Sequence, residues 1–556
     1  MSTTCQSYYA LKNPGENIDK THELYTLYYL FEIFKELNPS FFDKNKRPGR
    51  PRIYTADIML PFVQWGHLNK IISCRDLENW WTRNDETCNF ILSCKKPGKS
   101  SINEFLNDYN YLIDEFDKFI VDFSLKIGLM DGNIIYHDGT VFKGYCNNFK
   151  RLYANQLNYL KDFILKYQNE TDENGLWFKM DRYFNKNEFK DEIEPILKKL
   201  KEIVYAGGIY LLKSVFKQKN GLNKVLLKLK HMEENVKGNQ PISIVDPEAH
   251  SMLDKNEEWG FNYNFQSGID DKYGMIAIHY ITQSPNDKKE LSVTVNELNK
   301  ILGREDYIIV VDHGYWHIKS MKEIYNSPTT IIIPDRTAAS RNKQKSDKKV
   351  NKNPKKKSKI IDDKFRKPNF IKDWHNDFYT CPNGSILTRM NNNKQNGIEY
   401  KVYGTDDCFT CPDQNKCATE SKRKIKDRCE SEINEIKKIY YSEWGQKIYS
   451  KRGSNAEGNF ATLLESRNFR GIKTRGIKRV NDELTQYAIT HNIKKIHKHT
   501  TVNVLKTILN IIKQEKTKHK NVDINIIDEL IKEFIIEDEI IVDLKIKEKI
   551  GDLKIK

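Results

Sequence analysis

Three acidic residues that lie far apart in the chain are placed where they could bind divalent metal ions. Asp138 and Asp312 stand at the ends of hydrophobic, β-branched runs, and Glu457 opens an amphipathic segment rich in Arg and Lys. Three distant stretches of chain can bring such acids to one point in a fold. Hard cations such as Mg²⁺ prefer oxygen ligands, so this pattern predicts a carboxylate cluster for divalent metals.

Such a cluster suits phosphodiester chemistry, in which an attacking oxygen must become anionic near neutral pH and the leaving oxygen needs charge compensation. Two divalent ions about 3.5–4 Å apart can supply both effects. We expect Asp138 and Asp312 to share or flank the ions and Glu457 to complete the second site. The expected cofactor is Mg²⁺ or Mn²⁺.

Each acid also has a purely structural interpretation. Asp138 and Asp312 both stand close before a glycine, so each could end a strand in a turn. Ser454 and Glu457 have the spacing of a capping box, in which the glutamate only holds a helix start. Asp246 also follows a β-branched run and is the alternative to Asp138. Two neighbouring side chains could bind metal or substrate or could simply be polar: His137 and His313.

Cysteines form a second constellation with metal-ligand character. Cys408 and Cys411 make a Cys-x2-Cys pair, Cys417 follows six residues later, and Cys381 lies far upstream. Four thiolates can enclose a structural Zn²⁺, and Cys429 offers a substitute ligand. The alternative is a set of reduced thiols packed in a small insertion domain.

The charge balance agrees with a nucleic-acid partner. Among 556 residues there are 92 Lys and Arg against 76 Asp and Glu, which gives a formal net charge of +16. A field of this sign attracts a polyanion and raises encounter rates. The net charge alone does not identify an activity.

Length and apolar content allow several globular domains and argue against a membrane protein. At about 150 residues per domain, the chain has room for three or four. No apolar run approaches the ~18 residues of a membrane span, and the first residues begin no secretory signal. Ten unevenly scattered cysteines fit a reducing compartment better than a disulfide set. We therefore expect a location inside the cell.

Apolar periodicity predicts an α/β protein with a helical N-terminal domain and insertions. In the core, the order strand, hairpin, helix, strand, helix, strand is that of an RNase H-like mixed sheet flanked by helices. The core segments are a strand at 133–142, a hairpin within 262–281, helices at 290–302 and 318–325, and strands at 307–311 and 329–333. Further expected elements are helices at 24–37, 55–68 and 99–126, a helix capped by Ser73, two or three long helices in 152–236, and a strand at 241–246.

These elements give the expected domain division. The ranges are 1–130 for a helical DNA-binding or dimerisation domain, 131–340 and 440–500 for the catalytic domain with a helical insertion at 145–240, 341–439 for a basic linker and cysteine-bearing insertion, and 501–556 for a C-terminal extension.

Two basic segments could contact DNA. The short N-terminal helices are compatible with a helix-turn-helix reader or with a bundle that makes no DNA contact. Arg50 and Arg52 lie in a basic turn that resembles a minor-groove hook, although such a turn between helices needs no ligand. The lysine-rich stretch 340–367 could grip phosphates without sequence preference or be a solvated linker.

Ordered motifs connect these pieces to a known family. The segments that carry the resemblance are 51–55, 75–78, Asp138-Gly139-Thr140, 246–250, 263–266, 284–287, Asp312-His313-Gly314-Tyr315, Glu457 with 467–471, 475–480 and 491–495. In this order they resemble the DDE-type transposases of bacterial insertion sequences. The similarity is to the branch with a helical N-terminal domain and a cysteine-bearing insertion before the catalytic glutamate.

The resemblance implies that Asp138, Asp312 and Glu457 are the catalytic acids. It also implies cutting at the ends of an element and joining of those 3′-hydroxyl ends to target DNA by direct attack, without a covalent enzyme–DNA intermediate. The expected partners are double-stranded DNA and further copies of the chain, as a homodimer or larger assembly. The expected location is the cytoplasm of a bacterium or archaeon, in association with the nucleoid.

One position departs from the family pattern. Such families often carry a basic residue seven positions after the glutamate, and this chain has Leu464 there. DNA contacts must then come from elsewhere, or this copy is impaired. Basic residues around the glutamate could hold phosphates instead: Lys451, Arg452, Arg467, Arg470, Lys473 and Arg475.

Two other functions remain open at this point. One is a non-catalytic DNA-binding protein derived from a transposase, and the other is a metal-dependent nuclease with the same sheet. Intact acids at all three positions favour the enzyme over the binding protein. A nuclease differs from a transposase in that its products are cut and never joined to new DNA.

Overall fold

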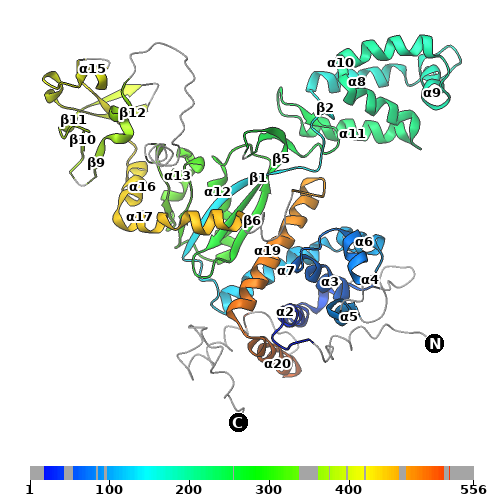
Figure 1. Cartoon of the computed structure of the whole chain (residues 1–556), viewed down its shortest axis with the longest axis horizontal. Coiled ribbons are helices and arrows are strands. Elements are labelled where there is room, and N and C mark those ends of the chain that lie inside the picture. The colour runs from blue at the N-terminus through cyan, green and yellow to red at the C-terminus, as the bar shows by residue number, and fades with distance from the viewer. Residues whose placement is uncertain are drawn as a thin grey trace.

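A computed structural model of the chain describes twelve stretches: residues 18–42, 54–82, 86–92, 97–254, 256–336, 338, 361–374, 376–395, 398–418, 421–461, 471–518 and 525. A mixed sheet lies at its centre, and helical and β-rich bodies surround the sheet (Figure 1). Among the described residues, no helix is long and apolar enough to cross a membrane.

The central sheet has both parallel and antiparallel neighbours. Its strand order is β4-β5-β1-β7-β8, and β6 also pairs with β5. β7 runs parallel to β1 and β8 parallel to β7, whereas β5 is antiparallel to β1, β4 and β6. This arrangement is compatible with an RNase H-like domain of the DDE type. The strands are β1 (Ile134–Lys143), β4 (His250–Leu253), β5 (Trp259–Asp270), β6 (Ile276–Thr282), β7 (Ile308–Val310) and β8 (Thr330–Ile332).

Helices cover both faces of this sheet because its strands are apolar on both sides. Along β1, Ile135 joins a core shared with α12 and the N-terminal helices, whereas Tyr136 joins a core with Tyr440 and Ile448 on the other face. Successive strand residues point to opposite faces, so the two layers follow from the alternation. The covering helices are α12 (Glu290–Leu302), α13 (Ile318–Tyr325), α16 (Ser431–Tyr441), α17 (Glu443–Ser450), α18 (Gly458–Ala461) and α19 (Ile477–His499).

The predicted order of core elements is confirmed, since β1, the β5–β6 hairpin, α12, β7, α13 and β8 follow one another as expected. The predicted strand at 241–246 is wrong as a member of this sheet. Only β3 (Ile242–Ser243) forms there, and it pairs with β2 (Arg151–Leu152) in a separate two-stranded ribbon.

The N-terminal helices form a bundle that the C-terminal part of the chain completes. α2 packs against α20, and α19 packs against α7, α3 and α2 as well as against β6 of the sheet. The Ser73 cap is confirmed, because its Oγ accepts a hydrogen bond from the Asp76 N–H at 3.0 Å. The bundle helices are α2 (Glu23–Leu37), α3 (Ala56–Leu68), α4 (Cys74–Thr82), α5 (Glu86–Leu92), α6 (Lys99–Asp108), α7 (Asn110–Lys126) and α20 (Val502–Lys518).

The single helix predicted over 99–126 is wrong. Tyr109 leaves the helical conformation, with φ −121° and ψ 19°, and separates α6 from α7. Its ring stacks on Phe105 with the centroids 5.6 Å apart. Apolar and aromatic residues continue at helical spacing through Tyr109, so periodicity alone does not reveal the break.

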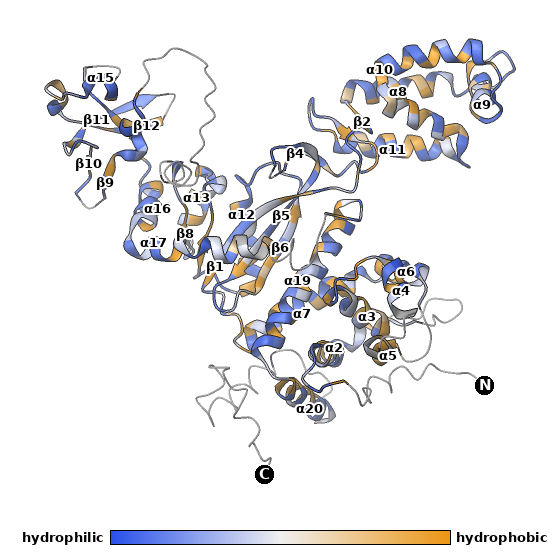
Figure 2. Cartoon of the chain, in the orientation of Figure 1, coloured by the Kyte–Doolittle hydropathy of each residue, from blue (hydrophilic) through white to orange (hydrophobic). Residues whose placement is uncertain are grey.

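Residues 145–240 form a helical body with a core of its own. Four helices are present instead of the predicted two or three, and the β2–β3 ribbon joins them to the sheet. Hydrophilic and hydrophobic residues alternate along these helices (Figure 2), as expected for helices that bury one face. The helices are α8 (Ala154–Tyr167), α9 (Leu176–Lys186), α10 (Lys190–Lys217) and α11 (Gly221–Asn235).

A second inserted body carries the cysteines and stands apart from the helical one (Figure 1). Its five-stranded sheet has the order β13-β12-β11-β10-β9. From it the chain returns through α16, which starts within the predicted insertion range and packs against β8. The elements are β9 (Ile371–Asp373), β10 (Phe378–Thr380), β11 (Ile386–Gln395), β12 (Ile398–Gly404), α15 (Gln414–Cys417) and β13 (Ile425–Arg428).

A buried ion pair ties the N-terminal bundle to the sheet. Nε2 of His279 in β6 lies 2.8 Å from Oδ2 of Asp117 in α7. Burial alone would lower the pKa of His279, but the charge and hydrogen bond of Asp117, with a further contribution from Asp114, raise it above its usual value. A raised folded-state pKa stabilises the fold at low pH, and that contribution is lost as pH rises through the folded value.

We predict that Asp117→Asn removes this pH-dependent part of the stability. Below about pH 6.5 the variant should lose roughly 1.5–3 kcal/mol, the contribution of a hydrogen bond to a charged group, and the loss should shrink at higher pH. Thermal unfolding midpoints between pH 5.5 and 8.5 measure this difference. Asp162→Asn, which changes an exposed acid of α8, is the control, and a pH-independent loss in Asp117→Asn would contradict the prediction.

Candidate active site

The strand register brings two of the predicted acids together. In the parallel pair of β1 and β7, Tyr136 lies opposite Val310. Two residues further along each chain, Asp138 and Asp312 therefore reach matching positions on the same face. Oδ1 of Asp312 accepts a hydrogen bond from the Gly314 N–H at 2.7 Å, which fixes this carboxylate at the end of its strand.

Asp138 is held in an environment that opposes its negative charge. Burial raises its pKa to about 6, the neighbouring Arg452 acts in the opposite direction, and the charges of Asp312 and Asp287 raise the pKa further. Arg452 is itself 8% exposed and places Nη2 2.9 Å from Oδ1 of Asp138. The site therefore consists of several half-buried carboxylates with one buried guanidinium against Asp138.

Asp287 is an acid of this site that the sequence analysis missed as a functional residue. It lies between β6 and α12, where its Oδ1 accepts hydrogen bonds from Asn264 at 2.8 Å and from Gln266 at 2.7 Å. Burial raises its pKa, the two amide donors lower it, and the charge of Asp312 raises it. Asp287 follows no strand signal, so only its position in the 284–287 motif set it apart.

The missing side chain of Gly139 leaves the space in which Asp287 approaches β1. A methyl group at Gly139 would collide with the side-chain amide of Gln266 and would lie 2.7 Å from Oδ1 of Asp287. The glycine after Asp138 is thus required by the close approach of Gln266 and Asp287, and its backbone is part of a regular strand. The turn predicted as an alternative for Asp138 is wrong.

A buried polar network supports the same residues from behind the strand. Nε2 of His137 lies 3.0 Å from Oε1 of Gln266 and 3.0 Å from Oγ1 of Thr294, and the Tyr315 hydroxyl donates to Gln266. Burial lowers the pKa of His137 to about 3, so its ring is neutral near pH 7. Its Nε2 belongs to this network, whereas its buried Nδ1 has no hydrogen-bond partner among the described residues. Nδ1 of His313 contacts the Pro334 carbonyl at 3.1 Å.

The segment around Glu457 is a continuous helical stretch with a π-helical turn at Gly453–Glu457 between α17 and α18. Oγ of Ser454 donates to the Lys451 carbonyl at 2.8 Å. The capping-box alternative is therefore wrong, and Glu457 lies within a helical segment instead of opening one. Ala456 packs in the core that contains Tyr136, so the backbone of Glu457 runs along the Asp138 face of β1; its side chain lies outside the described part of the structure.

The alternative acid Asp246 has a different role. It is 2% exposed, and its Oδ2 accepts from the Tyr263 hydroxyl at 2.9 Å while its Oδ1 accepts from the Gly476 N–H at 3.2 Å. These bonds tie the base of the helical insertion to β5 and to the start of α19. Asp246 is thus occupied as a structural acceptor.

The residues predicted to bind DNA lie in different environments. Lys451 pairs with Asp271 at 2.9 Å, and Arg452 pairs with Asp138 instead of facing solvent. The Lys473 side chain is exposed, and the exposed Arg475 donates from Nε to the Tyr145 carbonyl at 2.9 Å. Other predicted positions lie outside the described residues: Arg50, Arg52, Arg467, Arg470 and, with them, Leu464.

The cysteine set is brought together, but not as a metal centre. Cys381, Cys408, Cys411 and Cys417 line one small cavity of about 30 Å³. Burial raises the pKa of Cys417 to about 11, and nearby thiols contribute to the increase. Cys429 is not among the lining residues. Within the described residues no group of three or more His, Cys, Asp or Glu could hold a metal ion, so the predicted zinc site is not supported.

Comparison with known proteins gives one match. A family model described as "Transposase DDE domain" matches residues 380–497, about a fifth of the chain. This range contains Glu457 and the four clustered cysteines and excludes Asp138 and Asp312. No curated protein and no solved structure matches the chain. The match supports a DDE transposase and suggests a metal-dependent enzyme that binds and cleaves nucleic acid.

We predict that Gly139→Ala destabilises the protein by about 1–3 kcal/mol, the usual cost of overpacking a filled interior. The added methyl group must displace Gln266 or Asp287. Thermal unfolding measures the loss. Gly453→Ala adds the same group where nothing lies within 4 Å and serves as the control, so equal unfolding midpoints for the two variants would contradict the predicted clash.

Proposed function

We propose that this chain is a DNA transposase that cuts at the ends of an insertion sequence and joins the 3′-hydroxyl ends to target DNA. The observation that carries this function is the convergence of Asp138 and Asp312 on neighbouring parallel strands. The family match over the segment that contains Glu457 supports it independently. The excess of basic residues favours a polyanionic substrate.

The donor set around Asp138 has the right chemistry for a hard divalent cation. The described acids alone form no group of three that could hold an ion, so the proposal requires the Glu457 carboxylate as the third ligand beside Asp138 and Asp312. Burial and the charges of Asp312 and Asp287 already raise the pKa of Asp138 to about 6. In our proposal Asp138, Asp312 and Glu457 would hold Mg²⁺ or Mn²⁺, which supplies an anionic attacking oxygen and compensates charge on the leaving oxygen. No Ser or Tyr nucleophile is needed for direct attack by water or a 3′-hydroxyl.

Other groups hold the carboxylates of this cluster in position by hydrogen bonds. The Gly314 N–H holds Asp312 in place, and the amides of Asn264 and Gln266 hold Asp287. We propose that Asp287 is a positioning residue, which acts through the network on the two strand-end acids. Arg452 compensates the negative charge of Asp138 by an ion pair. If a bound metal ion compensated that charge instead, the Arg452 guanidinium would be suited to bind phosphate oxygens.

The experiment that tests the function is Mg²⁺-dependent excision and joining of a donor DNA that carries the gene's own flanking ends. We predict that the wild type yields joined products and that Asp312→Asn lowers their formation at least a thousandfold while it leaves the unfolding midpoint within about 2 °C. The reason is that loss of one ligand removes the metal-dependent rate enhancement.

Asp162→Asn is the matched control, because it makes the same change at an exposed position of the helical insertion. It should join DNA as the wild type does. Cut but unjoined products would identify a nuclease, and binding without cutting in every variant would identify a DNA-binding protein; either result would overturn the transposase function.

We further predict that Asp287→Asn raises the Mg²⁺ concentration for half-maximal cleavage by about 10- to 100-fold, the usual effect of losing a group that orients metal ligands. High Mg²⁺ should restore much of the cleavage rate. A Mg²⁺ titration of single-turnover cleavage measures this shift. A rate loss that Mg²⁺ does not rescue, or an unchanged titration, would contradict the positioning role.

A further inference from the structure

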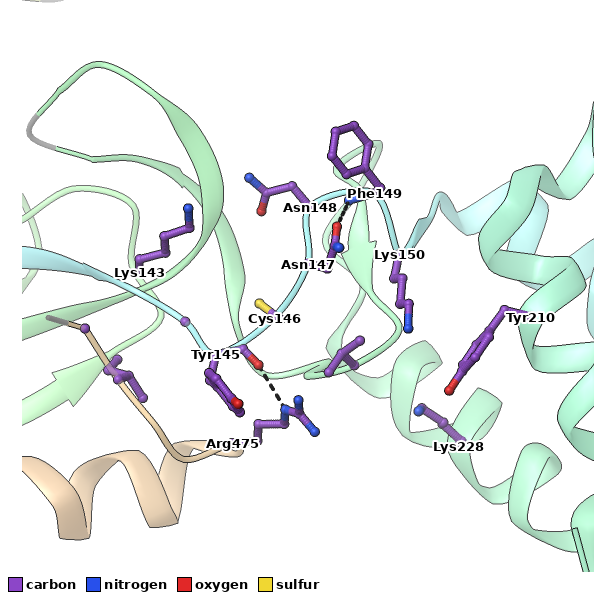
Figure 3. A pocket seen from close by; sticks show the side chains of 14 residues that line it. Lys143, Tyr145, Cys146, Asn147, Asn148, Phe149, Lys150, Tyr210, Lys228 and Arg475 are labelled. Atoms are coloured by element: carbon purple, nitrogen blue, oxygen red, sulfur yellow. Dashed lines mark hydrogen bonds between the residues drawn. The ribbon is translucent and has the colours of Figure 1, made fainter. Parts of the chain in front are cut away.

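A cavity of about 730 Å³ lies where three parts of the chain meet: the segment after β1, helices α10 and α11 of the insertion, and the turn before α19 (Figure 3). We call it the basic cavity. The residues of its lining that matter here are Lys143, Tyr145, Lys150, Tyr210, Lys228 and Arg475. It is separate from the carboxylate site.

The basic cavity gathers cations without countercharge. No Asp or Glu is among its described lining residues, and within the described part of the chain none of its Lys or Arg side chains takes part in a salt bridge. Burial lowers the pKa of Lys228, and the charges of Arg475 and Lys150 lower it further. Like charges held this close repel one another, so an anion that enters the cavity is stabilised.

Aromatic rings accompany these cations. Tyr145 is 55% exposed and Tyr210 is 49% exposed, which is unusual for large rings that line a concavity. Nζ of Lys150 lies 4.3 Å from the centre of the Tyr210 ring, and the Arg475 guanidinium lies 4.9 Å from that of Tyr145. Cations beside exposed aromatic rings are the combination that binds single-stranded nucleic acid, the cations on phosphates and the rings on bases.

The position of the cavity fits a strand that leaves the carboxylate site. Lys143 ends β1, five residues after Asp138, which is roughly 16 Å along an extended strand at about 3.3 Å per residue. A stacked DNA strand, at about 3.4 Å per nucleotide, covers that distance with about five nucleotides. Lys143 belongs to β1, and Tyr210 and Lys228 belong to the insertion, so an occupant would contact both the catalytic sheet and the insertion.

We propose that the basic cavity binds an unpaired DNA strand next to the cleavage site, with Lys150, Lys228 and Arg475 on its phosphates and with Tyr145 and Tyr210 stacked on its bases. This inference rests on the proposed function, because that function supplies the DNA. It assigns to the helical insertion the task of holding a strand end relative to the carboxylates.

Binding of a labelled 15-nucleotide oligothymidylate to the full-length protein tests the proposal. Fluorescence anisotropy is measured in EDTA at several salt concentrations, with a blunt duplex as the second probe. The double variant Lys150→Ala/Lys228→Ala should weaken single-strand binding about tenfold or more. It should also reduce the slope of log K against log[salt] by about 1.4, because each phosphate contact on a single strand contributes about 0.7.

Tyr210→Ala should weaken single-strand binding by about fivefold or more with an unchanged salt slope, since stacking releases no counterions. Duplex binding should change less than twofold in both variants. Lys230→Ala is the matched control: it removes one charge from an exposed position of α11, the helix of Lys228, outside the cavity lining, and should bind both probes as the wild type does.

Unchanged single-strand binding in both cavity variants would overturn the proposal. So would equal losses for single strand and duplex, or a wild type in which millimolar inorganic phosphate displaces the strand as well as unlabelled oligonucleotide does, since these results describe a general anion site. Binding in EDTA does not depend on catalysis, so failure of the strand site and failure of the transposase function give different results.

Discussion

Asp138, Asp312 and Asp287 carry like charges in a half-buried space, and mutual repulsion together with lost hydration makes that arrangement costly. The Arg452 guanidinium beside Asp138 offsets part of this cost, as do the side-chain amide donor to Asp287 and the backbone N–H donor to Asp312. The parallel register of β1 and β7 leaves no freedom to separate the first pair. A divalent cation in the same space would replace the guanidinium as the compensating charge.

The rest of the fold maintains this constraint. Gln266 of β5 connects Asp287 to His137 of β1 and to Tyr315 in the turn after Asp312. His137 extends this network to Thr294 of α12. Gly139 leaves the room that Gln266 occupies. On the other face of the sheet, α16 and α17 carry the chain back from the cysteine-bearing body and bring Arg452 and the Glu457 backbone to β1.

Much of the core could be predicted from the sequence, because its signals are local. The β-branched runs at β1, β7 and β8 and the apolar periodicity of α12 and α13 were sufficient to give the strand and helix order. The acids Asp138 and Asp312 were found because each ends such a run. Their shared position depended only on two neighbouring parallel strands.

The remaining features depend on tertiary contacts that no local pattern records. Asp287 lies in a loop, and its partners Asn264 and Gln266 meet it only when β5 is in place. The Ser454 spacing favours a helix start, but the chain arrives there already helical from α17. The break at Tyr109 and the basic cavity likewise arise from packing between segments distant in sequence.

The central claim is that the strand-end carboxylates form one divalent-cation site. Titration of the purified protein with Mn²⁺, followed by electron paramagnetic resonance of the free ion, tests it most directly. We predict saturable binding in the wild type that Asp138→Asn and Asp312→Asn each weaken by at least tenfold, while Asp162→Asn binds normally. Equal Mn²⁺ binding by the wild type and both site variants would contradict the claim.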